Sequence, residues 1–349
     1  MNQPFKSFLR GIGGRGIGGV FFFAAIVFSS CKGPSDKKGD DRDSLLQRPP
    51  YAALTDSIRQ STPEAAAGFY LRRGDLLSQH NMHEIAVDDY KRSWELQPNE
   101  ETGLHYASTL SIIGRTPQAV KLLEECLKKY PLNSDLAGLL GDIYVQSGQL
   151  KEAQALYESL LSADSANFEA WYEKGLLQEK AKDTAGAIVS LKKAYALQPV
   201  NTYTLELAHL YAEKGDNTAL KLCDEVLLRD STKELLDPFF IKGIYYSNTG
   251  QDPKAVIQFD SCIRRDWKFT EAYIEKGIIF FHQKKYDNAL TVFQMATTVS
   301  NTYPDAYYWL GRCYEATGKK DEAVIYYQQA LALDKDFSEA KDRINKLKG

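Results

Sequence analysis

One feature of this 349-residue chain constrains its fold more than any other: a small residue recurs every 33 to 35 positions along most of its length. The small residues are Gly74, Ala107, Gly141, Gly175, Ala208, Gly243, Gly277 and Gly311. An alanine follows each of them by about twelve positions, at Ala86, Ala119, Ala153, Ala187, Ala219, Ala255, Ala289 and Ala323. A mostly bulky residue stands four positions later, at Tyr90, Leu123, Tyr157, Leu191, Cys223, Phe259, Phe293 and Tyr327. Three series in phase over eight copies indicate a structural repeat.

The offsets within each copy are those of a helical hairpin. Two helices approach closely only where a small side chain on one admits a bulky side chain from the other. Helix-breaking residues punctuate the copies at Gly148, Gly215, Gly250, Gly318, Pro98, Pro131 and Pro199. Because a single hairpin leaves one face uncovered, consecutive hairpins are expected to stack. The spacing therefore predicts an all-α array of about eight hairpins over residues 67–337.

The clearest copy begins near Pro304 and carries Tyr307, Leu310, Gly311, Tyr314, Ala323, Tyr327 and Ala330. This pattern resembles the tetratricopeptide repeat, which places aromatic, Leu-Gly, Tyr and Ala positions over 34 residues. The resemblance implies a right-handed superhelical solenoid. Two copies depart from the pattern, with Tyr106-Ala107 and Leu207-Ala208 at the Leu-Gly position.

Short segments flank the repeats on both sides. Residues 51–66 place Tyr51, Leu54 and Ile58 at helical spacing, which predicts an N-terminal capping helix. Residues 338–349 place Ala340 and Ile344 on one stripe beneath a polar exterior, which predicts a C-terminal capping helix.

The N-terminus has the organisation of an export signal. A basic start without acidic residues precedes the apolar run 20–28 (VFFFAAIVF) and then Cys31. The run is about half of the roughly 20 residues that a spanning helix needs, so an uncleaved membrane anchor is the weaker interpretation. Residues 28–31 (FSSC) resemble the lipobox of bacterial lipoproteins, which implies cleavage of a signal peptide of residues 1–30 and three acyl chains on Cys31. Residues 31–50 are rich in Gly, Pro, Asp and Lys and are expected to form a lipidated flexible tether.

Composition and motifs argue against nucleic-acid binding, catalysis and metal binding. With 43 basic and 46 acidic residues, a formal charge of −3 and no basic cluster, the chain lacks the footprint of a nucleic-acid binder. No nucleophile-elbow, zincin or P-loop pattern is present, and the regular repeats leave no insertion for a catalytic loop. His80 and His83 lack further ligands for a metal site. Neither enzymatic activity nor a cofactor nor a metal is therefore expected.

The informative surface is the concave one, which in this family is formed by first-helix residues. The expected partner-binding residues are Tyr172, Phe240, Ile274, Ile278, Phe281 and Tyr308. The alternative is a purely structural role, in which some of these side chains only pack against neighbouring hairpins. Six positions before the small residue stand acids at Glu101, Asp135, Glu169, Asp237, Glu271 and Asp305. These acids either select a basic partner or simply complement helix dipoles.

The sequence as a whole predicts a non-enzymatic, membrane-anchored scaffold that holds a protein or peptide partner in its groove. Resemblance to repeat-bearing lipoproteins implies the outer membrane of a Gram-negative bacterium and a role in assembling cell-envelope complexes. The alternative is a carbohydrate- or nutrient-binding lipoprotein that uses the groove aromatics.

Overall fold

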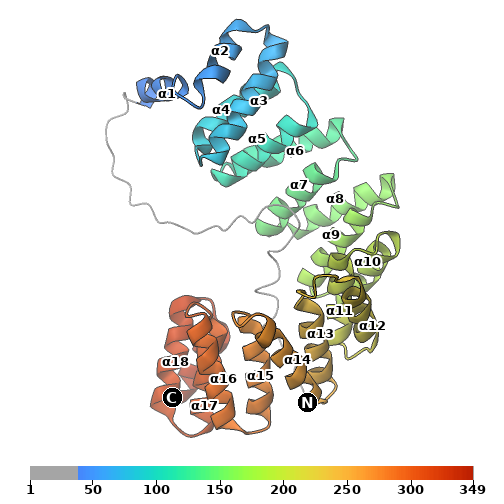
Figure 1. Ribbon diagram of the computed structural model, residues 1–349, viewed down its shortest axis with the longest axis vertical. Helices are drawn as coiled ribbons and strands as arrows, with labels where there is room; N and C mark the ends of the chain where they lie inside the picture. The colour runs from blue at the N-terminus through green and yellow to red at the C-terminus, as the bar shows by residue number, and fades with distance from the viewer. Residues whose placement is uncertain (1–37, 349) are drawn as a thin grey trace. The chain divides into compact units, whose positions relative to one another are not determined.

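The computed structural model describes residues 38–348, with side chains from Arg42 onward, and these residues form nineteen α-helices and no strand (Figure 1). The helices are α1 (Lys38–Leu46), α2 (Ala52–Gln60), α3 (Pro63–Gln79), α4 (His83–Leu96), α5 (Glu100–Ile112), α6 (Thr116–Lys129), α7 (Ser134–Gln146), α8 (Leu150–Ala163), α9 (Phe168–Lys180), α10 (Thr184–Leu197), α11 (Asn201–Glu213), α12 (Thr218–Arg229), α13 (Asp237–Asn248), α14 (Asp252–Arg265), α15 (Thr270–His282), α16 (Tyr286–Val299), α17 (Pro304–Ala316), α18 (Lys320–Leu333) and α19 (Ser338–Lys348). Helices α3 to α18 pair in chain order into eight hairpins. The predicted all-α architecture of consecutive hairpins is confirmed.

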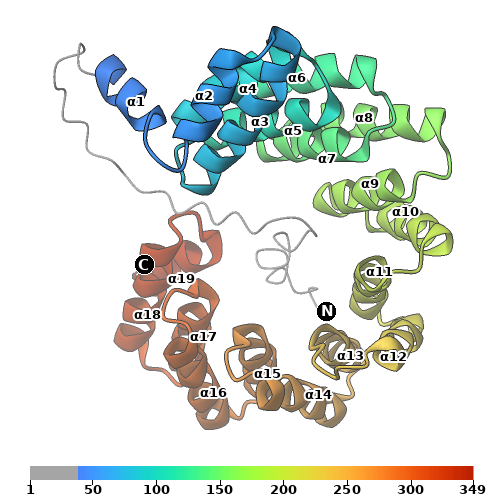
Figure 2. The same ribbon diagram turned by 45° about the horizontal axis from the view of Figure 1, so that its top comes forward.

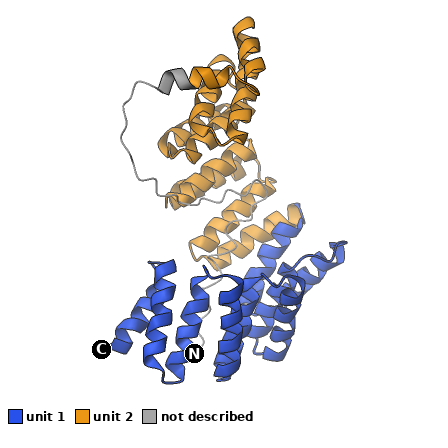
Figure 3. Ribbon diagram, turned by 60° about the vertical axis from the view of Figure 1, so that its left-hand side comes forward, with its two compact units in different colours: residues 1–22, 198–349 blue, residues 23–197 orange. Residues whose placement is uncertain are grey.

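The hairpins belong to two compact units (Figure 3). The α1–α10 unit comprises described residues 38–197, and the α11–α19 unit comprises residues 198–348. Within each unit the second helix of one hairpin contacts the first helix of the next, as α4 contacts α5 and α14 contacts α15 (Figure 2). First helices of successive hairpins also touch, as α11 touches α13 and α15 touches α17. Each unit is therefore a stack in which every hairpin packs on its neighbours in sequence.

A glycine against a buried bulky side chain holds most hairpins together. A Cβ built on Gly277 would lie only 2.5 Å from Cε1 of Phe293, and Phe293 is fully buried. The same approach joins Gly74 with Tyr90, Gly141 with Tyr157, Gly175 with Leu191, Gly243 with Phe259 and Gly311 with Tyr327. In the two hairpins that carry alanine, the bulky position holds the smaller Leu123 and Cys223. The close approach predicted from the spacing is thus confirmed in the six hairpins that carry glycine.

The turn inside each hairpin requires one residue with left-handed backbone. Five turns use glycine, at Gly114, Gly148, Gly215, Gly250 and Gly318, with φ between 66° and 81°. The other three use Asn81, Lys182 and Lys284, with φ of 59°, 64° and 59°. A lysine in this region carries steric strain between its Cβ and the backbone that a glycine avoids.

We expect Lys284→Gly to stabilise the α15–α16 hairpin by roughly 0.5–1 kcal/mol, because it removes that strain at a helix C-terminus where glycine is favoured. Urea denaturation gives the free energy of unfolding. Lys285→Gly is the matched control, since Lys285 has an ordinary φ of −84° and glycine there only adds chain entropy. A Lys284→Gly variant no more stable than Lys285→Gly would contradict the strain argument.

Both ends of the array are covered by helices. Helix α2 packs on α3, and α19 packs on α18 with Ala340 and Ile344 buried. The sequence predicts a flexible tether over residues 31–50, but part of this segment is helical: α1 occupies Lys38–Leu46, and Leu46 is buried. The predicted signal peptide and Cys31 lie outside the described residues. Within residues 38–348 no helix has the combination of length and apolar character that crossing a bilayer demands.

Candidate partner-binding surface

The predicted partner-binding residues fall on first helices, but mostly in one unit. Tyr172 lies on α9 of the α1–α10 unit and is partly exposed. Phe240 lies on α13, Ile274, Ile278 and Phe281 lie on α15, and Tyr308 lies on α17, all in the α11–α19 unit. Tyr172 and the other five residues therefore belong to different compact units.

Four of the six predicted residues are buried: Phe240, Ile274, Ile278 and Tyr308 are 1%, 3%, 2% and 9% exposed. The Phe240 ring packs 5.6 Å from Phe259 and 5.3 Å from Phe269, measured between centroids. Neighbouring side chains of the hairpins cover these four residues, as in the alternative in which groove positions pack against adjacent hairpins. The role of these four residues in binding stays a prediction. Of the six predicted partner-binding residues, Tyr172 and Phe281 are partly exposed.

Phe281 is the centre of an aromatic group at the C-terminal end of α15. Its ring lies edge-on to Trp309 at 5.3 Å, to Tyr286 at 5.5 Å and to His282 at 5.8 Å. Trp309 in turn stacks on the buried Phe293 with an interplanar angle of 13°. The hydrophobic core therefore fixes the position of Phe281, while part of its ring remains accessible.

Arg312 completes this group. Its guanidinium carbon lies 5.2 Å from the ring centroid of Phe281, 5.5 Å from Trp309 and 5.9 Å from Tyr308. One of its nitrogens donates a hydrogen bond of 3.2 Å to the Tyr308 hydroxyl. We call Phe281, Tyr308, Trp309 and Arg312 the aromatic–arginine cluster. Cation–π contacts hold the cation in a defined orientation, which suits recognition of a planar anionic or amide group.

Comparison with known proteins identifies the repeat. Four models of the tetratricopeptide repeat match the chain, at residues 114–175, 168–201, 277–318 and 304–337. The chain carries tetratricopeptide repeats. The predicted repeat family is therefore confirmed. Tetratricopeptide repeats typically build protein-binding scaffolds without enzymatic activity.

The tetratricopeptide relatives are distant. A "TPR repeat-containing protein" of Treponema pallidum is 25% identical over 217 residues, which covers 53% of this chain and 27% of that protein. A DnaJ homolog subfamily C member 7 homolog of Schizosaccharomyces pombe is 22% identical over 84% of this chain and 62% of its own length. The chain spans only 17% to 36% of the length of the first three curated relatives it matches.

Two solved bacterial structures share the fold. A tetratricopeptide-repeat protein from Parabacteroides merdae has a TM-score of 0.62 at 18% identity, covering 71% of this chain and 98% of its own. PilW, a type IV pilus biogenesis factor, has a TM-score of 0.51 at 18% identity, covering 62% of this chain and 98% of its own. At this identity the likeness supports the helical-repeat fold alone.

Arg312 is not among the predicted partner-binding residues, although its position in the repeat indicates a groove-facing side chain. It stands one residue after the repeat glycine, a position that faces the groove in this family. The same position holds Asp75 and Ser108 in the first two repeats. Because the residue type changes from repeat to repeat, periodicity alone did not single Arg312 out.

The first helices of the α1–α10 unit carry an acidic face. Asp75 accepts hydrogen bonds from the Tyr90 hydroxyl at 2.9 Å and pairs with Nδ1 of His105 at 2.7 Å. The hydrogen bond to Asp75 raises the pKa of His105. On α9, burial and the nearby carboxylates of Asp142 and Glu169 raise the pKa of Glu173 to about 7. This face therefore gains negative charge as the pH rises toward neutrality.

We expect the stability of the α1–α10 unit to fall as the pH rises from about 4.5 to about 7. The folded unit retains a proton on Glu173 over this window while the unfolded chain has lost it, so ionisation opposes folding. Glu173→Gln should remove much of this loss, which urea titrations at pH 5 and pH 8 measure. Glu152→Gln, at an exposed position, is the control. A Glu173→Gln variant with the same pH dependence as the parent would contradict the assignment.

The cysteines of the described residues and His80 have structural roles. Cys126, Cys223, Cys262 and Cys313 are buried free thiols, and burial raises the pKa of each. Nδ1 of His80 lies 2.8 Å from the Tyr51 hydroxyl and so helps to hold the N-terminal cap. Among residues 38–348 no group of three or more His, Cys, Asp or Glu side chains is arranged to hold a metal ion.

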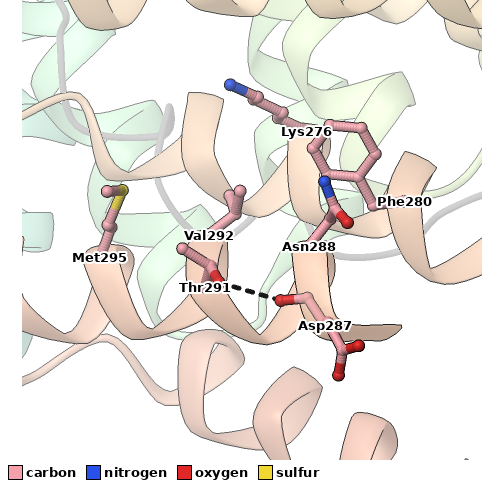
Figure 4. A pocket seen from close by; sticks show the side chains of 7 residues that line it. All are labelled: Lys276, Phe280, Asp287, Asn288, Thr291, Val292 and Met295. Carbon is pink, nitrogen blue, oxygen red and sulfur yellow. Dashed lines mark hydrogen bonds between the residues drawn. The ribbon is translucent and has the colours of Figure 1, made fainter. Parts of the chain in front are cut away.

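A depression on the α15–α16 hairpin is open rather than enclosed. Its lining residues are Lys276, Phe280, Asp287, Asn288, Thr291, Val292 and Met295 (Figure 4). The Thr291 hydroxyl donates to the Asp287 carbonyl oxygen at 2.9 Å, and Nζ of Lys276 pairs with Asp260 at 2.6 Å. Because the depression is open and its Lys276 and Thr291 already have polar partners, the aromatic–arginine cluster remains the better candidate for binding.

Proposed function

We propose that this tetratricopeptide-repeat protein is a lipid-anchored scaffold of a Gram-negative cell envelope. In this proposal it holds a protein or peptide partner against its first helices and helps to assemble an envelope complex. The observation that carries the partner-binding part is the aromatic–arginine cluster, in which a partly exposed Phe281 and Arg312 are fixed by buried rings. Rigid aromatic and arginine side chains are the residue types that dominate protein interfaces.

The envelope setting is supported by two further observations. Residues 28–31 resemble a lipobox behind an export signal. One bacterial neighbour of similar fold is described as a pilus biogenesis factor, and assembly of envelope structures is the activity that we transfer from it as a proposal. A carbohydrate ligand is the alternative; at the aromatic–arginine cluster it would require an exposed flat ring, whereas Trp309 of this cluster is 7% exposed.

Photo-crosslinking tests partner binding in the native envelope. A photoreactive amino acid at position 281 should give a discrete crosslinked product, and Arg312→Ala should abolish it. The same amino acid at position 325 is the control, because Ile325 is 53% exposed on the second helix α18. Equal products from both positions, or a product at 281 that survives Arg312→Ala, would remove the cluster from the proposal.

Membrane fractionation tests the anchor. Cys31→Ser should release the protein from membranes and abolish incorporation of a labelled fatty acid, because two or more acyl chains are needed for firm attachment. Ser35→Ala, in the same segment, should change neither. A Cys31→Ser protein that stays in the membrane fraction would instead favour an uncleaved N-terminal anchor.

A further inference from the structure

The turn between α14 and α15 exposes the most accessible tryptophan of the described chain. Trp267 is 60% exposed, whereas Trp309 is buried and Trp94 and Trp171 are only partly exposed. The turn itself is well held: the Tyr273 hydroxyl donates to the Trp267 carbonyl oxygen at 3.1 Å. The Phe269 amide donates to the Asp266 carbonyl oxygen, also at 3.1 Å. The indole is therefore presented to solvent from a fixed backbone.

Three cations flank this tryptophan in the sequence, and one of them, Lys268, lies near its ring. Arg264 and Arg265 end α14, Lys268 follows the tryptophan, and all three are exposed. Arg265 stacks 4.0 Å from the Phe239 ring centroid, and Nζ of Lys268 lies 5.5 Å from that of Trp267. Within residues 38–348 none of the three pairs with a carboxylate within 4.0 Å. Their polar contacts are hydrogen bonds from Arg264 and Arg265 to Ser261.

The charge of this turn opposes that of the chain. Residues 264–268 hold three cations and one acid, Asp266, which is a net charge of +2, while the whole chain is at −3. The Asp266 carboxylate accepts a hydrogen bond from the Lys268 backbone amide at 2.8 Å and so stabilises the turn. An exposed indole among unpaired cations is the combination that favours the headgroup region of an anionic bilayer.

We propose that the turn of residues 264–268 docks on the surface of an anionic lipid bilayer. The indole enters the headgroup layer, and the three cations lie against lipid phosphates. Charge complementarity selects this occupant: the site offers positive charge and an amphipathic ring, which match the phosphates and the interfacial layer of an anionic bilayer. The inference rests on the proposed lipid anchor at Cys31 for its setting, since acylation would attach the chain to a membrane.

Vesicle binding tests the proposal with a chain of residues 32–349, which keeps every described residue and carries no acyl group. We expect this chain to partition onto vesicles of phosphatidylglycerol mixed with phosphatidylcholine, with a blue shift of tryptophan emission. The double variant Arg264→Gln with Lys268→Gln should partition roughly 10- to 30-fold less well, at about 1 kcal/mol per cation. Trp267→Phe should remove the blue shift while the protein remains bound.

Ile257→Ala is the matched control, because Ile257 is 58% exposed on the same hairpin but lies in the middle of α14. Circular dichroism verifies that each variant is folded. Equal partition onto pure phosphatidylcholine, or a double variant that binds like the parent, would overturn the proposal. Competition by soluble polyglutamate without any blue shift would identify an acidic protein segment as the occupant instead. Because Cys31 is absent from this assay, its failure would leave the acylation test in cells unaffected.

Discussion

Replacing Phe259 by alanine should lower the free energy of unfolding by roughly 3–5 kcal/mol. The ring is fully buried, packs against the bare backbone of Gly243 and lies 5.6 Å from Phe240. Its removal leaves a cavity that two rigid helices cannot close, so both burial and packing are lost. Urea denaturation of the full chain measures the change. A loss below about 1 kcal/mol would mean that the ring is not part of the core.

A second substitution makes this test specific to the glycine contact. Gly243→Ala should destabilise the parent, because the new methyl group meets the Phe259 ring. In the Phe259→Ala background the same Gly243→Ala should stabilise, since the methyl group enters the cavity and alanine favours the helix by about 1 kcal/mol. An effect of the same sign in both backgrounds would show that the two residues do not compete for one space.

The second large effect is expected from Asp89→Ala. Asp89 accepts two hydrogen bonds of 2.7 Å from Nε and Nη2 of Arg73, and both side chains are buried. Nη1 of Arg73 also donates to the Thr55 hydroxyl at 2.8 Å, which ties α2 to the first hairpin. Without Asp89 the guanidinium is left buried and uncompensated, at a cost of roughly 3–5 kcal/mol.

Denaturation with hydrogen exchange over α2, α3 and α4 measures the effect of Asp89→Ala and locates it. The paired change Arg73→Met with Asp89→Leu should cost much less, because no charge is left buried. Glu95→Ala provides an exposed comparison, since Glu95 and Lys91 are 3.7 Å apart and largely in solvent, and should cost less than about 0.5 kcal/mol. Equal losses in Asp89→Ala and the paired variant would attribute the cost to packing rather than charge.

The hairpins could be predicted from sequence because their decisive contacts are local. Gly277 and Phe293 are only 16 positions apart. The rule that a small residue on one helix admits a bulky side chain from its partner helix needs no knowledge of the rest of the chain. Helix α1 was not predicted, because its sequence KGDDRDSLL is almost entirely polar and its buried Leu46 finds neighbours only in the folded cap.

The candidate surface was harder to predict, because it depends on contacts between hairpins. Phe240 occupies a groove position by register, but its ring meets Phe269, which precedes the next first helix. Arg312 gains significance only because Phe281, Tyr308 and Trp309 converge on it from two hairpins. Such convergence depends on side-chain orientation, which periodicity does not specify.

In six hairpins a buried bulky side chain meets the glycine of the same hairpin, so the contact that closes each of them lies within its own repeat. An in-frame duplication or loss of one whole repeat would leave the closing contact of every other hairpin unchanged, with only the interfaces at the junction to be rebuilt. A deletion of a few residues inside a hairpin would instead separate a ring from its glycine. The length of this protein can therefore change during evolution in steps of one repeat, and each step alters the extent of the binding surface without changing the packing rule.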